Sequence, residues 1–381
     1  MIPYGKQDIN QEDIDAVIDV LRSDFITQGP KIPIFEKSLT NYTGAKYACA
    51  VNSGTSALHI ACHALGVSQG DLVWTSPVTF VASSNCALYC GGDVDFVDIE
   101  EATYNMSISA LEEKLIKAKQ ENKLPKVVIP VHLCGQPCDM EAIAELAKEY
   151  DFNVIEDASH AVGGKYQNEP IGNCKYSDIT VFSFHLVKIV TTAEGGMIMI
   201  NDKKLAEKLN LARSHGITRD ESLMTEASHG PWYYQQIDLG YNYRLTDIQA
   251  ALGINQMKRI DEFVKIRNSL SNRYDALLND LPVQIPIQPS FCYSARHLYV
   301  IRLKDHKNHK AVFEKMRSMG IGVNLHYIPV HLQPYYQKLG HKTGDYPVAE
   351  KYYASAISLP LYTQLTHTQQ EEVVAALKAA V

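Results

Sequence analysis

The sequence predicts an α/β fold, in which a mostly parallel seven-stranded sheet is covered by helices and followed by a smaller α+β unit. Between residues 47 and 200, short apolar runs alternate with helical patterns, as they do in βαβ units. Several of these runs are apolar throughout, which is typical of strands that are buried on both faces. After residue 245 the pattern changes to long helical stretches. The alternation therefore predicts one large sheet with helices on both faces, and the change to long helical stretches predicts a second unit.

Seven apolar runs of strand length account for the predicted sheet. They are YACAV (47–51), DLVWTSP (71–77), VDFVDI (94–99), KVVIPVHL (126–133), FNVIED (152–157), ITVFSF (179–184) and MIMI (197–200). Helical patterns lie between them at 55–65, 80–90 and 140–150. Parallel neighbours need crossover connections of a dozen or more residues, and these helices supply them.

The second unit begins with a long helical pattern over 246–281, which one or two helices would satisfy. HLYVIRL (297–303), a helical AVFEKMRSMG (311–320), GVNLHYI (322–328) and a terminal helix over 369–380 follow. A chain of 381 residues is too long for one ordinary core, so we expect two domains, 1–250 and 251–381.

Composition excludes several classes of protein. The apolar fraction of 46% and charged fraction of 21% are those of a folded globular chain, and the net charge of −7 without a basic block disfavours nucleic-acid binding. No run is long enough to span a membrane, and the acidic N-terminus does not resemble a signal peptide, so we expect a cytoplasmic protein. The eight cysteines lack the paired spacing of a zinc site, even in CGQPC (134–138), so we expect free thiols and no metal.

Lys188 lies between two buried runs, in ITVFSFHLVKIVTTAEGGMIMI (179–200). Most lysines are solvated surface charges, but a lysine held here would be partly desolvated. Desolvation lowers the pKa of an ammonium group, and the neutral amine can attack a carbonyl. The position therefore indicates a nucleophile.

Two carboxylates, Glu156 and Asp157, end the run NVIED. Ligands of open α/β sheets bind beyond the carboxyl ends of the strands, so a carboxylate there suits a general base, a metal ligand or the partner of a protonated heterocycle. Helix capping by Asp157 is the competing interpretation.

VNSGTSALHI (51–60) follows a strand, turn, helix order, and backbone N–H groups at such a helix start can bind an anion. Simple capping explains this segment about as well. A lysine, a carboxylate and an anion site together fit one cofactor, pyridoxal phosphate (PLP), with an aldehyde, a ring nitrogen and a phosphate. Phe80 is a candidate for stacking on the ring, although an ordinary core position would also explain it.

The chain resembles the DegT/DnrJ/EryC1/StrS-type aminotransferases, which act on nucleotide-linked ketosugars and are fold-type I PLP enzymes. The segments that carry the resemblance run nearly end to end: FITQGPKIPIFE, AVNSGTSALHIAC, SPVTFVASSNCALY, VDFVDI, VIPVHLCGQPCDM, VIEDASHAVGG, FSFHLVKIVTTAEGG, RSHGITRD, GYNYRLTDIQAALG, VNLHYIPVHLQPYY and AISLPLY. Within the family, ASHAVGG, TTAEGG and RSHGITRD are most similar to the transaminases of pseudaminic acid synthesis.

The resemblance implies a role for each matching residue. Lys188 would carry the cofactor as a Schiff base and shuttle the proton, Asp157 would pair with the ring nitrogen, and His160 would lie near the phenolic oxygen. The phosphate would be held by Gly54, Thr55, Ser56 and Ser183, the ring would stack on Phe80, and Asn242 would reach the phosphate of the neighbouring subunit of a homodimer. The family has proline where Leu186 stands, which puts the backbone path to Lys188 in doubt. Alanine is frequent among relatives where Gly54 stands.

The implied reaction moves an amino group from L-glutamate to C4 of a UDP-4-keto-6-deoxy sugar. The expected sugar is UDP-2-acetamido-2,6-dideoxy-β-L-arabino-hex-4-ulose, and the product is UDP-4-amino-4,6-dideoxy-N-acetyl-β-L-altrosamine. Candidate substrate contacts are Thr27, Gln28, Gly29, His185, Arg213, His215, Arg219, Tyr327 and His331, and for each of them a surface-loop position is an equally good explanation.

Other functions stay open at this point. A C4 aminotransferase for a D-configured UDP- or dTDP-ketosugar would share every motif. A sugar dehydratase of the same fold would replace the lysine with histidine, which Lys188 argues against. A nicotinamide-dependent epimerase would need a glycine fingerprint that is missing, since Tyr42 and Lys46 match its Tyr-x-x-x-Lys pair only by chance. A non-catalytic binding protein would not need Lys188, Asp157 and Glu194.

Overall fold

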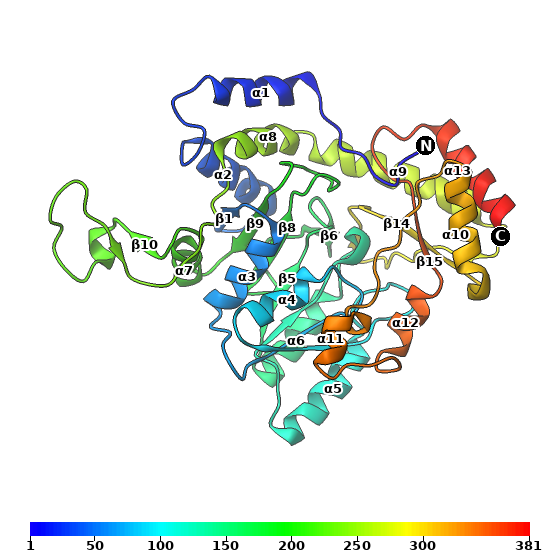
Figure 1. Cartoon of the computed structure of the whole chain (residues 1–381), viewed down its shortest axis with the longest axis horizontal. Helices are drawn as coiled ribbons and strands as arrows, with labels where there is room; N and C mark the ends of the chain where they lie inside the picture. The colour runs from blue at the N-terminus through cyan, green and yellow to red at the C-terminus, as the bar shows by residue number, and fades with distance from the viewer.

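Seven strands form the central sheet in the computed structural model, which describes residues 1–381 (Figure 1). Their spatial order is β1 (Tyr47–Val51), β9 (Gly196–Ile200), β8 (Ile179–Ser183), β5 (Asn153–Asp157), β4 (Val127–Ile129), β2 (Leu72–Thr75) and β3 (Asp93–Phe96). All strands are parallel except β9, which is antiparallel to both of its neighbours. Every residue of β8 and β9 is buried, because helices cover both faces. The predicted α/β fold with a mostly parallel seven-stranded sheet is confirmed.

Helices form a layer on each side of this sheet. One apolar core joins the sheet to α3 (Gly54–Ala64), α4 (Ala82–Tyr89) and α7 (Lys203–Arg213). The other joins it to α2 (Lys31–Thr43), α5 (Ile108–Glu121), α6 (Met140–Tyr150) and α8 (Asp247–Met257). The N-terminal helix α1 (Gln11–Leu21) packs on α8. Side-chain caps set where these helices start: the Ser53 hydroxyl accepts the Ser56 N–H at α3, and Thr246 and Gln249 form a capping box at α8.

The C-terminal unit packs α9 (Ile260–Leu278), α10 (His309–Ser318) and α13 (His367–Ala380) on a three-stranded sheet. That sheet contains β12 (Val283–Gln284), β14 (Tyr299–Leu303) and β15 (Ala356–Leu359). Two short helices, α11 (Pro334–Lys338) and α12 (Pro347–Tyr353), turn back onto the large unit, where the Tyr336 hydroxyl bonds Ser84 and Asn85 on α4. None of the helices is both long and apolar enough to cross a membrane.

Two small sheets complete the fold. One joins β6 (Lys165–Tyr166), β7 (Glu169–Pro170) and β13 (Cys292–Tyr293), and the other pairs β10 (Ile217–Thr218) with β11 (Gln235–Gln236). The second sheet lies in a segment that projects from the body beside α7, which we call the arm (residues 217–240; Figure 1).

The domain boundary at 250/251 remains a prediction, and it falls inside α8. The extreme N-terminus packs with the C-terminal unit, because the Ile2 N–H donates to the Gly320 carbonyl and the Ile2 side chain joins that unit's core. The first residues of the chain therefore pack in the core of the C-terminal unit and not in the large unit.

Candidate active site

A cavity of about 410 Å³ opens beyond the carboxyl ends of the central strands. Ligand sites of α/β sheets lie at this edge. The large unit lines it with Ser53, Gly54, Thr55, Leu58, Thr79, Phe80, Ala82, Ser83, Val131, Asp157, Ser159, His160, Ser183, His185, Val187, Lys188 and Glu194. The N-terminus adds Tyr4, and the C-terminal unit adds His297, His326 and Tyr327. The cavity thus contains both residues that the sequence marked as chemically distinctive, Lys188 and Asp157.

Lys188 projects into the cavity from the turn that follows β8. The turn is held by a hydrogen bond from the Lys188 N–H to the His185 carbonyl (2.9 Å). Burial lowers the pKa of Lys188 to about 8, and the negative charge of Asp157 partly opposes this shift. A substantial fraction of this amine is therefore neutral near physiological pH, as a nucleophile requires.

We expect Lys188 to react with small electrophiles at a lower pH than exposed lysines do. At pH 8 about half of this amine should be neutral, against less than about 1% for an ordinary lysine. Peptide-resolved reductive methylation with formaldehyde measures this, with exposed Lys165 as the internal control. Labelling of Lys188 should rise to half its maximum near pH 8, and parallel pH profiles for the two lysines would contradict the assignment.

Asp157 ends β5 and is only 4% exposed. Its Oδ2 accepts a hydrogen bond from the Ser83 hydroxyl (2.6 Å), which in turn bonds the Thr79 hydroxyl (2.7 Å). Its Oδ1 accepts the Ser159 N–H (3.1 Å). These bonds orient a buried carboxylate without neutralising it, so it can still pair with a protonated group in the cavity.

Replacing Ser83 with alanine should weaken PLP binding about tenfold, because a hydrogen bond to a buried charged group is typically worth about 1.5–3 kcal/mol. Equilibrium dialysis of the apo-protein measures the affinity. Ser84→Ala is the matched control, since Ser84 lies on the same helix and bonds Tyr336 instead of Asp157. Equal affinities of the Ser83 and Ser84 variants would show that Ser83 does not support Asp157.

The start of α3 forms one end of the cavity. Gly54, Thr55 and Ser183 line it, and a Cβ at Gly54 would come within 3.0 Å of the Ser183 Cβ. The N–H groups at a helix start bind anions readily. Ser56, predicted here as a phosphate contact, does not line the cavity: its N–H bonds Ser53 and its hydroxyl donates to the Asn52 carboxamide (2.6 Å).

Gly196 packs against the backbone at the start of α3. A Cβ there would lie 2.5 Å from the Ser53 carbonyl oxygen and 2.9 Å from the Gly54 nitrogen. We expect Gly196→Ala to displace the turn, to weaken PLP binding at least about tenfold and to lower the melting temperature by several degrees, since overpacking costs about 1–3 kcal/mol. Dialysis and thermal denaturation measure both effects. At the control position, Gly5, a Cβ would meet only Val187 at 3.9 Å, so Gly5→Ala should change neither.

Three histidines and a tyrosine line the side of the cavity toward the C-terminal unit. His160 Nε2 lies 3.2 Å from the Tyr327 hydroxyl, and the His160 and His297 rings are 4.4 Å apart. Burial, the charge of Lys188 and that of His326 lower the pKa of His160, and burial with the charge of Lys188 lowers that of His326 to about 4. These imidazoles are therefore neutral hydrogen-bonding groups at physiological pH.

The cavity fits the expected cofactor. His160 is 6% exposed and its Nδ1 has no hydrogen-bond partner within the chain, so a polar group in the cavity would satisfy it. Lys188, Asp157 and the start of α3 supply the amine, the carboxylate and the anion site that PLP requires. Phe80 also lines the cavity, and 59% of its surface is exposed. Its ring is therefore available to stack on the ring of a cofactor.

The structure does not bring every predicted substrate residue to this cavity. Arg213 is held elsewhere, because its guanidinium bonds Glu36 and the Ala50 carbonyl. His331 is fully buried and bonds Glu350 (2.9 Å). Neither side chain is therefore free to meet a diphosphate. Tyr327 and His185 do line the cavity, and His185 Nε2 lies 3.7 Å from the Glu194 carboxylate.

The remaining candidates lie outside the cavity of their own chain. Thr27 forms a bridge with Thr246, and the Gly29 N–H donates to Asp247 (2.7 Å), so the 27–29 segment, which includes Gln28, is held at the start of α8. His215 and Arg219 are exposed near the base of the arm, and Asn242 forms a bridge with Ser214 there. Their predicted roles, including the contact of Asn242 with a second subunit, stay predictions.

Several lining residues have no clear signal in the sequence. Thr79 and Ser83 could have been suspected from hydroxyls four residues apart near a helix start. His297 and His326 come from the second unit, and only the tertiary fold places them opposite His160.

Comparison with known proteins agrees with this geometry. The model of the DegT/DnrJ/EryC1/StrS aminotransferase family matches residues 7–378. The chain is 37% identical to the UDP-4-amino-4,6-dideoxy-N-acetyl-beta-L-altrosamine transaminase of Campylobacter jejuni, over 96% of this chain and 93% of that protein. Other curated relatives, 34–35% identical, have names that refer to different sugars.

Solved structures agree as well. The putative sugar aminotransferase Spr1654 from Streptococcus pneumoniae, in its PMP form, superposes with a TM-score of 0.92 at 29% identity, covering 100% of this chain and 99% of that one. Helicobacter pylori PseC, an aminotransferase involved in the biosynthesis of pseudoaminic acid, superposes with a TM-score of 0.91 at 31% identity, covering 100% and 98%. The chain belongs to the DegT/DnrJ/EryC1/StrS aminotransferase family and is a PLP-dependent nucleotide-sugar aminotransferase.

Proposed function

We propose that this enzyme transfers the amino group of L-glutamate to C4 of UDP-2-acetamido-2,6-dideoxy-β-L-arabino-hex-4-ulose. The product would be UDP-4-amino-4,6-dideoxy-N-acetyl-β-L-altrosamine, a precursor in pseudaminic acid synthesis. The observation that carries amino transfer is the position of Lys188, a partly buried amine in one cavity with Asp157. The relationship to the Campylobacter jejuni transaminase supports the choice of sugar.

Each residue around the cavity has a proposed task. When bound, PLP supplies an aldehyde that accepts the amino group and a ring that draws electrons from the bond losing its proton. Lys188 Nζ takes the proton from Cα of the amino donor and later gives one to C4 of the sugar, which suits a pKa of about 8. Asp157 would keep the ring nitrogen of a bound cofactor protonated, and the start of α3 with Ser183 would hold the phosphate.

Two side chains are the best placed to orient the sugar. Tyr327 is fixed by its hydrogen bond to His160, and His185 lies beside Glu194 at the mouth of the cavity. The C-terminal residues that line the cavity, His297, His326 and Tyr327, would help to exclude water from it. Hydrolysis and amino transfer would then stay separate steps. No arginine lines the cavity to clamp the carboxylate of the donor.

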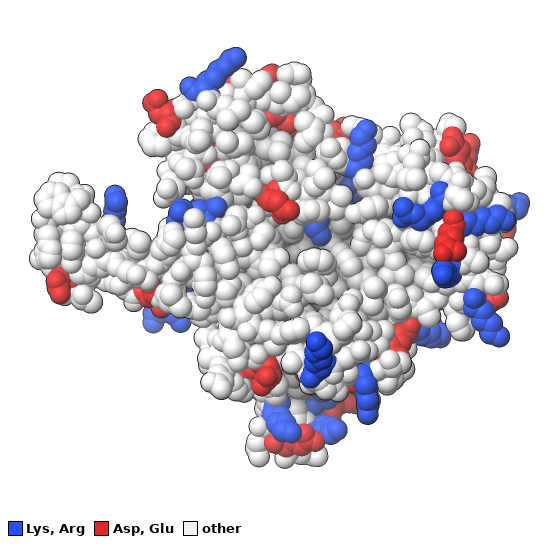
Figure 2. Space-filling model, in the orientation of Figure 1, with Lys and Arg blue, Asp and Glu red and all other residues white.

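We also propose that two copies of the chain form a homodimer through the face that includes the arm. Trp232 is 72% exposed there and Leu239 is 65% exposed. Charged side chains are sparse on the arm and on the adjoining surface in the view of Figure 2. Monomers rarely expose such apolar residues together without a partner. The free state of all eight cysteines supports a reducing compartment, so we propose the cytoplasm.

A panel of UDP-4-ketosugars with L-glutamate, followed by mass-resolved product analysis, tests the substrate. The β-L-arabino sugar should react at least about tenfold faster than its D-xylo epimer, because one misplaced polar contact costs about 1–3 kcal/mol. Preference for the D-xylo sugar, or for a dTDP-sugar, would instead support the alternative of a D-configured substrate. A product that has lost oxygen without gaining nitrogen would indicate a dehydratase.

A further inference from the structure

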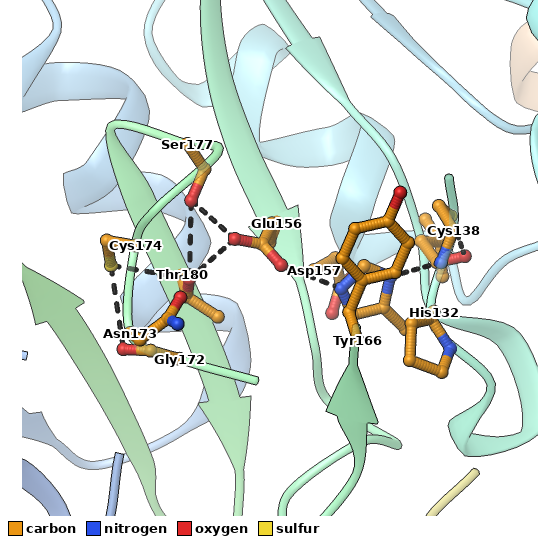
Figure 3. Close-up of polar contacts among 12 residues, drawn as sticks. His132, Cys138, Glu156, Asp157, Tyr166, Gly172, Asn173, Cys174, Ser177 and Thr180 are labelled. Carbon is orange, nitrogen blue, oxygen red and sulfur yellow. Dashed lines mark hydrogen bonds and ion pairs between the residues drawn. The ribbon is translucent and has the colours of Figure 1, made fainter. Parts of the chain in front are cut away.

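A buried polar network lies on the face of the sheet opposite the cavity, immediately behind Asp157 (Figure 3). Its centre is Glu156, which precedes Asp157 on β5, and adjacent residues of a strand point to opposite faces. Glu156 is 4% exposed and its carboxylate lies against His132, whose Nε2 is 2.9 Å from Oε2. The hydroxyls of Ser177 and Thr180 donate to Oε1. Both oxygens of this carboxylate are therefore bonded.

The hydrogen bonds also show which ring nitrogen of His132 carries the proton. The Cys138 N–H donates to His132 Nδ1 (3.1 Å), so that nitrogen has no proton, and Nε2 must carry the one that is donated to Glu156. His132 is thus a neutral imidazole and Glu156 is an anion. Burial alone would raise the pKa of Glu156, but its contacts with His132, Ser177 and Thr180 lower it below its ordinary value.

On the β4 side, backbone pairing of β5 is sparse where this network lies, whereas on the other side β5 pairs with β8 through Ile155, Glu156 and Asp157. β4 and β5 pair through Val127 with Asn153 and Val128 with Val154, and nearer the cavity only an isolated bridge joins Val131 to Asp157. Pro130, between them, has no N–H to donate. That bridge consists of two bonds, from the Asp157 N–H to the Pro130 carbonyl (2.9 Å) and from the His132 N–H to the Asp157 carbonyl (3.1 Å). His132 therefore holds Asp157 through its backbone and Glu156 through its side chain.

We propose that Glu156 and His132 form a positioning pair for Asp157. The imidazole joins the segment after β4 to the end of β5, and so determines where the Asp157 carboxylate lies in the cavity. The buried anion of Glu156 adds negative potential on the protein side of that carboxylate. This inference rests on the proposed pairing of Asp157 with the cofactor ring.

Variants of His132 test the positioning. His132→Leu removes the contact, and at saturating PLP it should lower kcat about 10- to 100-fold and weaken PLP binding at least about tenfold, since small displacements of catalytic groups cost that much. His132→Gln keeps an N–H near the position of Nε2 and should restore kcat to within about threefold of the wild type. If His132 only filled space in the core, His132→Leu should retain more activity than His132→Gln.

Glu156→Gln tests the charge, because it keeps the size of the side chain and can keep all three hydrogen bonds. With the anion gone, protons on the bound cofactor should be held less tightly. The pH midpoint of the cofactor's visible absorption band should therefore move down by about half a unit or more. His132→Leu combined with Glu156→Leu should regain stability over His132→Leu alone, since no unpaired buried charge remains, while kcat stays low.

Two controls separate the outcomes. Asp13→Asn alters another fully buried carboxylate, which binds Arg259 and Gln256 away from the cavity, and it should lower stability without changing the absorption band. Asp157→Asn should change both PLP affinity and the band. If Asp157→Asn has these effects and the His132 and Glu156 variants do not, the positioning pair is wrong and the proposed function stands. If Asp157→Asn also leaves PLP affinity and the absorption band unchanged, Asp157 does not pair with the cofactor ring, and the positioning pair has no function.

Discussion

Lys188→Ala should abolish amino transfer, with kcat falling about 10⁴-fold or more, because proton transfer by a positioned group contributes about 10²–10⁴-fold and covalent attachment is lost as well. The structure offers no substitute at that place. His185 is the nearest titratable side chain in the sequence, but it is exposed at the cavity mouth beside Glu194. Coupled detection of 2-oxoglutarate release from L-glutamate measures the first half of the reaction without any sugar.

Two measurements keep this prediction specific. Lys165→Ala, at the exposed first residue of β6, should retain wild-type kcat, which would show that the loss of any lysine is not enough. Adding methylamine should partly restore proton transfer in Lys188→Ala if the defect is the missing amine. Retention of more than about one tenth of wild-type activity would assign the chemistry to another residue.

Asp157→Asn should lower kcat about 10²- to 10³-fold, a loss of transition-state stabilisation of about 3–4 kcal/mol. An amide matches the carboxylate in size and can keep the Ser83 and Ser159 contacts, but it brings no negative charge to hold a proton on the ring nitrogen. Steady-state kinetics at saturating PLP separate this effect from weaker cofactor binding. A variant that loses only PLP affinity, with kcat unchanged, would limit Asp157 to binding.

The predictable parts of this protein are those encoded by local patterns. Seven apolar runs identified the strands of the sheet, and the positions of Lys188 and Asp157 at strand ends brought both to one cavity edge. Alternation of strands and helices does not encode the order of the strands, so the antiparallel placement of β9 between β1 and β8 could not be foreseen. Helices α2, α5 and α7 are absent from the predicted helical patterns, because only a narrow stripe of each is buried.

The site was less predictable where it depends on contacts between distant segments. Arg213 looked free to bind a phosphate because Glu36, 177 residues earlier in the chain, becomes its partner only in the fold. Ser83 looked like one of several helical hydroxyls until folding placed it 2.6 Å from Asp157. His297 likewise enters the cavity from the second unit. Such pairings follow from packing of the two units, which periodicity and spacing do not describe.

Borohydride reduction of the PLP-loaded protein, followed by peptide mapping, shows whether Lys188 holds the cofactor as a Schiff base. One peptide should gain the mass of a reduced pyridoxyl phosphate group, fragmentation should place that group on Lys188, and glutamate added before reduction should prevent the labelling. A label on any other lysine, or a protein that binds PLP without becoming labelled, would rule out Lys188 as the Schiff-base lysine.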